Sequence, residues 1–327
     1  MMTGITSHGE KRLVLVTGRA HPELAQTVAD ELNIEVVPTT LYDFASGEIY
    51  VRFAESVRGT DAFVLQSHTA PINKWIMEQL LMVDALKRAS VKSITAVMPF
   101  YGYARQDKKH RGREPISARL MADMFFTAGA DRLMSVDLHA AQTQGFFNGP
   151  VDHLWAMPIL TDYVRTRVDL GNAAVVSPDA GRIRVAEQWA ARLGGVPLAF
   201  VHKTRDITRP NQAVANRVVG EVAGRDCILV DDLIDTGGTI TEAVKVVMAE
   251  GARSVIVAAT HGVLSDPATQ RLADCGATEV VITDTLPIPE EKRVEPLTVL
   301  SIAPLIARAI REVFDDGSVT SLFDGNA

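Results

Sequence analysis

One stretch organises this sequence: Cys227-Ile228-Leu229-Val230-Asp231-Asp232-Leu233-Ile234-Asp235-Thr236-Gly237-Gly238-Thr239-Ile240-Thr241. It opens with an apolar run that is typical of a strand buried in a parallel sheet. A pair of carboxylates and a turn of small residues follow. A helix is then indicated by apolar side chains that recur at helical spacing, which are Ile240, Ala243, Val244, Val247 and Met248. Gly251 stands where a C-terminal cap belongs, so the stretch predicts a strand, a tight turn and a helix.

The turn of this unit has the chemistry of an anion site beside hydrogen-bond acceptors. Gly237 and Gly238 let the backbone bend tightly and approach a ligand. The first N–H groups of the helix have no partner within the helix, and the helix dipole favours an anion there. Asp231 and Asp232 could accept hydrogen bonds from vicinal sugar hydroxyls or hold a hydrated Mg²⁺. An Asp-capped strand–turn–helix connection is the plainer interpretation, but a third acid and the nearby hydroxyls favour a sugar phosphate: Asp235, Thr236, Thr239 and Thr241.

These residues resemble the phosphoribosyl-binding loop of the type I phosphoribosyltransferase family. The resemblance implies that Asp231 and Asp232 bind the ribose hydroxyls. The 5-phosphate is then expected at the residues of the turn, Asp235, Thr236, Gly237, Gly238 and Thr239.

Composition excludes several other classes. The chain has 327 residues, which is enough for two domains, and its 47% hydrophobic and 22% charged residues are those of a soluble globular protein. The net charge of −7 argues against a general nucleic-acid binder. Cys227 and Cys275 are the only cysteines and have no metal-ligand spacing, so a reducing cytoplasm is expected. The polar N-terminus lacks the apolar region of a signal peptide, and no run is long enough for a membrane span.

Residues 99–115 form the most polar long loop of the first half, Phe100-Tyr101-Gly102-Tyr103-Ala104-Arg105-Gln106-Asp107-Lys108-Lys109-His110-Arg111-Gly112-Arg113-Glu114. Such a run could be a solvated loop, a nucleic-acid patch or a grip for a polyphosphate, and the acidity of the chain disfavours the second. The aromatic rings suit a base and the guanidinium groups suit phosphates, which leaves a solvated loop and a nucleotide site about even. The run from Tyr101 to Ser117 is similar, residue for residue, to the ATP-binding segment of the ribose-phosphate pyrophosphokinase family.

That resemblance implies a set of nucleotide contacts. Arg105, Gln106 and Asp107 are expected to bind ATP. Phe44 and Glu48 are expected to reach the adenine, in this family from a neighbouring subunit. The intervening Ser46 and Gly47 are included among the ATP-binding residues.

His139 is the expected metal contact of the first half. A lone histidine after a strand is usually a packed or surface residue. This one follows the strand predicted at Arg132–Val136 and stands near Asp137, at the carboxyl end where sites in open α/β sheets gather. The run from Asp137 to Phe147 also looks like the ribose-phosphate pyrophosphokinase family, in which this histidine meets the Mg²⁺ of MgATP.

The second half has two further motifs. Ser177-Pro178-Asp179-Ala180-Gly181-Arg182 follows a predicted strand, and either its amides cradle a pyrophosphate while Asp179 binds Mg²⁺, or Asp179 caps a helix. The order of motifs favours the first, because the family's pyrophosphate loop falls here. His202-Lys203-Thr204-Arg205-Asp206 opens a polar segment that is either surface or a lid. The resemblance implies the family's flexible catalytic loop, with Lys203 and Arg205 as its cations and Arg205 also at the ribose 5-phosphate.

The fold expected is α/β, with two similar domains, each a mostly parallel sheet flanked by helices, as in the type I phosphoribosyltransferase fold. Glu35–Pro38 and Ile49–Phe53 are among the strands expected in the first domain. The expected boundaries are residues 1–12 as a disordered extension, 13–149 as the ATP-binding domain, 150–303 as the ribose-phosphate-binding domain and 304–327 as a C-terminal helix and tail.

Over about Leu13 to Gly325 the resemblance implies transfer of the β,γ-diphosphoryl group of ATP to the C1 hydroxyl of ribose 5-phosphate, for nucleotide, histidine and tryptophan biosynthesis. It implies Mg²⁺ as cofactor and a homohexamer with phosphate and ADP sites at subunit contacts. Neither nucleic acid nor membrane is an expected partner. Three positions depart from the family pattern: Ser46 where an Asp is common, Thr204 where an Arg is common, and Arg182 where a second Gly is common.

Two other functions compete with this interpretation. A salvage phosphoribosyltransferase would share the turn at 235–239 but has no use for the Arg105 segment. A catalytically silent regulatory homologue would have no physical reason to keep the charged and metal-binding residues Lys203, Arg205, His139 and Asp179.

Overall fold

The computed structural model describes residues 11–203 and 216–323. It divides the chain into two compact units, one formed by Met1–Leu154 with Ala303–Ala327 and the other by Trp155–Ile302. Each unit is an α/β layer structure with a mostly parallel sheet, so the fold class expected from the sequence is confirmed. No helix in the described parts of the chain combines the length and apolar character needed to cross a bilayer.

The first unit is built on a five-stranded parallel sheet in the order β1-β4-β5-β6-β7, with strands Leu13–Thr17, Asp61–Leu65, Ser93–Met98, Arg132–Val136 and Val151–Leu154. One face packs its valines and alanines against α2 (Ile72–Arg88) and α3 (Ser117–Ala128). Alternate residues such as Leu15 and Phe63 are equally buried and point to the other face, as the pleat of a strand requires. Helix α8 (Ala303–Phe314) packs against α1 (Pro22–Leu32), which ties the C-terminal helix to this unit.

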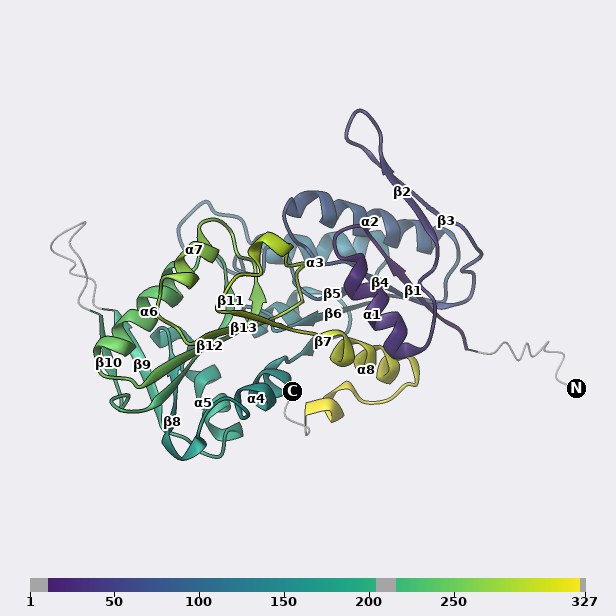
Figure 1. Ribbon diagram of the computed structural model, residues 1–327. Helices are drawn as coiled ribbons and strands as arrows, with labels where there is room; N and C mark the ends of the chain where they lie inside the picture. The colour runs from purple at the N-terminus through teal and green to yellow at the C-terminus, as the bar shows by residue number, and fades with distance from the viewer. Residues whose placement is uncertain (1–10, 204–215, 324–327) are drawn as a thin grey trace, which may run out of the picture. The chain divides into compact units, whose positions relative to one another are not determined.

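A separate two-stranded hairpin completes the first unit. Strand β2 (Thr39–Asp43) pairs antiparallel with β3 (Ile49–Phe53), and the loop between them projects beyond the helices (Figure 1). The prediction of a strand at Glu35–Pro38 is wrong. Only Val36 there forms a bridge, to Leu15, and Pro38 has no N–H to extend a ladder.

The second unit holds a seven-stranded sheet in the order β10-β9-β8-β11-β12-β13-β14. Its strands are Ala173–Ser177 (β8), Leu198–Lys203 (β9), Asn216–Val219 (β10), Asp226–Ile234 (β11), Ser254–Gly262 (β12), Glu279–Thr283 (β13) and Leu297–Leu300 (β14). All pairs are parallel except β9 with the edge strand β10. Its helices are Met157–Val164 (α4), Ile183–Arg192 (α5), Gly238–Ala249 (α6) and Ala268–Ala273 (α7). Helix α6 buries Ile240, Ala243, Val244 and Val247 as its spacing predicts, but Met248 is 38% exposed.

The division between units differs from the boundaries expected from the sequence. Val151–Leu154 pairs with β6 and therefore belongs to the first sheet, so the boundary falls after Leu154 and not at residue 149. The last helix also belongs to the first unit, where Arg311 Nη2 donates a hydrogen bond to the Leu32 carbonyl at 3.0 Å. Both differences arise from pairings that are distant along the chain.

Candidate active site

Three predicted motifs of the second unit follow strands that are neighbours in the sheet. β9, β8 and β11 run in parallel, with Val176 of β8 opposite both Ala199 and Leu229. The carboxyl ends of parallel strands meet at one edge of a sheet, where ligands of open α/β folds bind. The turn after β8, the end of β9 and the turn after β11 therefore share this edge. Lys203 is the last residue of β9, whereas its side chain and Arg205 lie outside the described residues.

The turn between β11 and α6 has a left-handed residue at its centre. Gly237 is the N-cap of α6 and has a φ of 74°, a value that glycine adopts at low cost. Thr236 and Thr239 on either side of the glycines are exposed. Thr241 is buried instead, and its hydroxyl donates to the Gly238 carbonyl at 3.2 Å, so it packs within the helix. The turn thus places two exposed threonines beside the N-terminus of α6.

The acid pair at the end of β11 is half-buried and already faces a cation. Arg182 Nη2 lies 2.8 Å from Asp232 Oδ1, and Arg182 Nε lies 3.5 Å from Asp231 Oδ1. The Asp232 amide also donates to Asp231 Oδ1 at 2.9 Å. Burial raises the pKa of the Asp231 carboxyl well above its ordinary value, the charge of Asp232 adds to the rise, and Arg182 opposes it.

Asp179 shapes the turn after β8. Its Oδ1 accepts a hydrogen bond from the Gly181 amide at 2.8 Å, and the Ser177 hydroxyl donates to its carbonyl at 2.6 Å. Both interpretations of this residue therefore have support in the geometry. One oxygen caps the short turn Ala180–Arg182, and a half-buried carboxylate stands at the sheet edge.

In the first unit, the loops after β5 and β6 meet at the carboxyl edge of the sheet. β5 and β6 are parallel neighbours, and Gln142 Nε2 donates to Asp107 Oδ2 at 2.7 Å, which joins the two loops directly. Asp107 is therefore buried beneath the loop, whereas Arg105 and Gln106 are exposed on it. Half-buried His139 stands at the start of the second loop.

Several contacts hold the Arg105 loop in shape. The Tyr101 hydroxyl donates to the Ala118 carbonyl at 3.0 Å, and the Ser117 hydroxyl donates to Gln106 Oε1 at 2.7 Å. The Gly102 amide donates to His68 Nδ1 at 2.9 Å. Burial lowers the pKa of His68 to about 4, so this histidine is neutral and its ring nitrogen can accept that bond. These hydrogen bonds of buried residues therefore fix the conformation of the polar loop.

The predicted adenine contacts all lie in the exposed turn of the β2–β3 hairpin. Phe44 is 47% exposed and stands edge-on to Tyr42 and Tyr50, which stack on each other at 4.7 Å. Gly47 has a φ of 91°, and the Ser46 hydroxyl donates to Glu48 Oε2 at 2.8 Å. The serine that departs from the family pattern thus orients the neighbouring carboxylate.

The base of the hairpin is fixed by an ion network that the sequence did not indicate. Asp43, next to Phe44, accepts from Arg19 Nη2 and Lys74 Nζ, both at 2.6 Å. Arg19 also donates to Glu78, whose side chain is fully buried on α2. These hydrogen bonds hold the pKa of Asp43 below its ordinary value.

The residues that could hold Mg²⁺ are few. Within residues 11–203 and 216–323, no three His, Cys, Asp or Glu side chains are grouped as a metal site. Asp179 offers a carboxylate oxygen and His139 an imidazole. Mg²⁺ commonly takes one or two protein ligands and completes its shell with phosphate oxygens and water, so each of these residues, within its own unit, fits that ion as a ligand.

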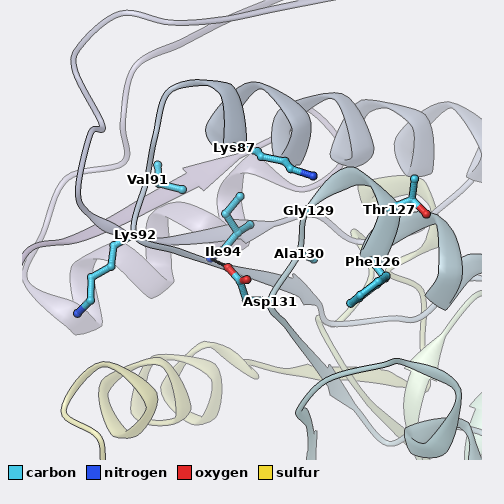
Figure 2. A pocket seen from close by; sticks show the side chains of 9 residues that line it. All are labelled: Lys87, Val91, Lys92, Ile94, Phe126, Thr127, Gly129, Ala130 and Asp131. Atoms are coloured by element: carbon cyan, nitrogen blue, oxygen red, sulfur yellow. Dashed lines mark hydrogen bonds between the residues drawn. The ribbon is translucent and has the colours of Figure 1, made fainter.

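A hollow in the surface of the first unit is unrelated to these motifs. It has a volume of about 510 Å³, and its lining includes Ile94 near the start of β5 and Asp131 just before β6 (Figure 2). It therefore lies at the amino ends of these strands, whereas the Arg105 loop follows the carboxyl end of β5. It is lined by Lys87, Val91, Lys92, Ile94, Phe126, Thr127, Gly129, Ala130 and Asp131. Arg105, Gln106, Asp107 and His139 lie instead on the loops after β5 and β6, at the other edge of this sheet.

The sequence did not predict that two arginines contribute to the candidate sugar-phosphate site. Arg271 Nη1 donates to the Thr236 carbonyl at 2.9 Å, which places a cation beside the turn. Arg182 was noticed only as a departure from a glycine. No sequence signal identifies either contact, because each depends on which elements the sheet brings together.

Known proteins resemble this chain over nearly its whole length. Residues 13–129 match the family model of the N-terminal domain of ribose phosphate pyrophosphokinase, and residues 207–324 match the phosphoribosyl synthetase-associated domain. A ribose-phosphate pyrophosphokinase of Bifidobacterium longum is 73% identical over 317 residues, covering 96% of this chain and 93% of the relative. One of Mycobacterium tuberculosis is 67% identical over 317 residues, with 97% of each chain covered. The crystal structure of phosphoribosylpyrophosphate synthetase from Mycobacterium smegmatis aligns with a TM-score of 0.89 at 64% identity, covering 94% of this chain and 100% of that one.

Proposed function

The chain belongs to the ribose-phosphate pyrophosphokinase family, and from that premise we propose how its residues divide the reaction. The activity is transfer of the β,γ-diphosphoryl group of ATP to the C1 hydroxyl of ribose 5-phosphate, which gives 5-phosphoribosyl 1-diphosphate and AMP. Such a transfer needs in-line positioning and compensation of charge more than covalent help from the protein.

The sugar phosphate binds at the turn between β11 and α6. The observation that best supports this assignment is the left-handed Gly237, because it turns the chain from β11 into α6 between the exposed Thr236 and Thr239. Asp235, Thr236, Gly237, Gly238 and Thr239 hold the 5-phosphate through those amides, the hydroxyls and the helix dipole. Asp231 and Asp232 accept hydrogen bonds from the ribose hydroxyls through their carboxyl oxygens.

ATP binds at the loops of the first unit. Arg105 and Gln106 contact the nucleotide from the exposed side of their loop, and the buried Asp107 supports that loop through Gln142. Phe44 stacks on the adenine of a neighbouring subunit, with Ser46, Gly47 and Glu48 in the same turn. The exposure of the aromatic cluster supports such an intersubunit contact. A homohexamer with phosphate and ADP sites at subunit contacts is part of the same proposal.

His139 of the first unit and Asp179 of the second are each a ligand that would contact Mg²⁺, which would neutralise part of the phosphate charge when bound. Lys203 and Arg205 face the charge that grows on the transferred group. The position of Lys203 at the end of β9, next to the turn that carries Asp179, supports this role. Groups of this kind act by preorganised electrostatics in a site from which water is excluded.

One assay tests the proposal against its rivals. Incubation of the protein with ATP, Mg²⁺ and ribose 5-phosphate should release AMP in step with 5-phosphoribosyl 1-diphosphate. Consumption of that diphosphate in the presence of a purine base would instead indicate a salvage transferase. Release of no AMP would indicate a regulatory homologue and contradict the proposal.

A further inference from the structure

Arg182 places a positive charge against both carboxylates of the sugar-binding edge. Its Nη2 lies 2.8 Å from Asp232 Oδ1 and its Nε 3.5 Å from Asp231 Oδ1. The three side chains are only 17%, 14% and 10% exposed, in the order Arg182, Asp231 and Asp232. Water therefore screens these charges far less than it would on an open surface.

The contact is built by the sheet and by the turn after β8. β8 and β11 are in register, with Val176 opposite Leu229, so residues just beyond each strand face one another. The Asp179 carboxylate and the Gly181 amide fix the short turn, and Arg182 ends it as the N-cap of α5. Arg182 has a φ of −106°, which any residue adopts, so the backbone does not require glycine here.

Two adjacent carboxylates in a half-buried place oppose each other's ionisation. A carboxylate that has taken up a proton becomes a donor and loses part of its capacity to accept from a sugar hydroxyl. A guanidinium across the pair offsets that repulsion and also holds both side chains in one orientation. A carboxylate has about four acceptor positions, so it can hold a guanidinium and a sugar hydroxyl together.

We infer that Arg182 is a positioning residue for ribose recognition, holding Asp231 and Asp232 as oriented acceptors for the vicinal hydroxyls of the sugar. This inference rests on the proposed binding of ribose by that acid pair. If Arg182 only joined two elements, its loss would lower stability alone, because removing one partner of a buried ion pair leaves the other charge uncompensated. A positioning role has a different signature, because the effect of losing Arg182 must depend on the hydroxyls of the sugar.

The test compares two sugars and three variants. Arg182→Gln removes the charge and keeps most of the side-chain volume, Arg182→Lys keeps the charge, and Arg184→Gln is the matched control at an exposed position two residues on. KM and kcat are measured with ribose 5-phosphate and MgATP. Dissociation constants for ribose 5-phosphate and 2-deoxyribose 5-phosphate are measured by calorimetry on each variant, with a thermal melt to verify folding.

We expect Arg182→Gln to raise the KM and dissociation constant of ribose 5-phosphate roughly tenfold to a hundredfold, the range for a lost charged hydrogen-bond partner. The KM for ATP should stay within about twofold. The same substitution should raise the dissociation constant of 2-deoxyribose 5-phosphate only a few-fold, because this sugar lacks one of the hydroxyls that Asp231 and Asp232 bind. Arg182→Lys should recover part of the loss, and Arg184→Gln should match the parent.

Two results overturn the inference. One is a folded Arg182→Gln enzyme with the parent's affinity for ribose 5-phosphate, and the other is an equal loss for both sugars. A parent enzyme that binds both sugars equally would instead overturn the proposed role of the acid pair. The comparison within each variant does not depend on the fraction of protein that is active.

Discussion

Gly237→Ala isolates the contribution of one backbone conformation to sugar-phosphate binding. Gly237 has a φ of 74° at the N-cap of α6, and an added Cβ would lie no closer than 3.5 Å to Ala268, an ordinary contact. The substitution therefore causes no steric clash, and it lowers stability only through the backbone conformation that alanine must adopt. A left-handed L-residue costs about 1–2 kcal/mol, of which the stiffer unfolded chain returns about 0.4–1 kcal/mol.

The expected loss of unfolding free energy is thus about 1 kcal/mol. The functional loss should be larger, because relief of the strained φ turns the α6 amides away from the 5-phosphate. A small misplacement of such groups costs up to about a hundredfold, so the KM for ribose 5-phosphate should rise about tenfold to a hundredfold. The KM for ATP should not change.

Gly224→Ala is the matched control, because Gly224 has a φ of 72° and open space around its Cβ position. It should lose the same unfolding free energy and keep the parent's KM. Urea unfolding and steady-state AMP release measure the two quantities. Equal kinetics in the two variants, or a Gly237→Ala enzyme with the parent's KM, would refute the role of this turn.

Three further substitutions separate the remaining roles. Lys203→Ala should lower kcat by about 10²–10³ with little change in either KM, because a preorganised charge is lost from a site that excludes water. A kcat for AMP release within a few-fold of the parent would exclude Lys203 from stabilising the transferred group. Phe44→Ala should raise the KM for ATP about tenfold or more, because base stacking is lost. Phe126→Ala removes a similarly exposed ring elsewhere and should leave this KM unchanged. The same KM for ATP in both variants would contradict the adenine contact. Arg271→Ala should raise the KM for ribose 5-phosphate a few-fold, about the worth of one hydrogen bond; calorimetry showing unchanged affinity would remove Arg271 from the site.

Sequence patterns predicted the parts of the candidate site whose structure depends only on residues close together in the chain. The apolar run of β11, the glycine turn and the α6 periodicity lie within 23 consecutive residues from Cys227 to Ala249, so their structure follows from short-range rules. The family resemblance placed Asp107 among the ATP contacts, and that assignment stays a prediction for a residue that is buried and accepts a hydrogen bond from Gln142.

Contacts between segments that are distant along the chain could not be predicted from local sequence patterns. Arg182 meets the acid pair because β8 and β11 are paired in register, and Arg271 meets Thr236 because α7 follows a neighbouring strand. The hairpin base depends likewise on Arg19 and Glu78, which are 59 residues apart. Charged residues on turns look alike in a sequence, and only the sheet order distinguishes a solvated side chain from one that holds a substrate group in place.

The most direct measurement is a crystal structure of the protein with ribose 5-phosphate bound. The 5-phosphate should lie against the first amides of α6 between Thr236 and Thr239, with the sugar hydroxyls on Asp231 and Asp232. A sugar phosphate bound elsewhere, with this turn empty at saturating concentration, would contradict the proposed site.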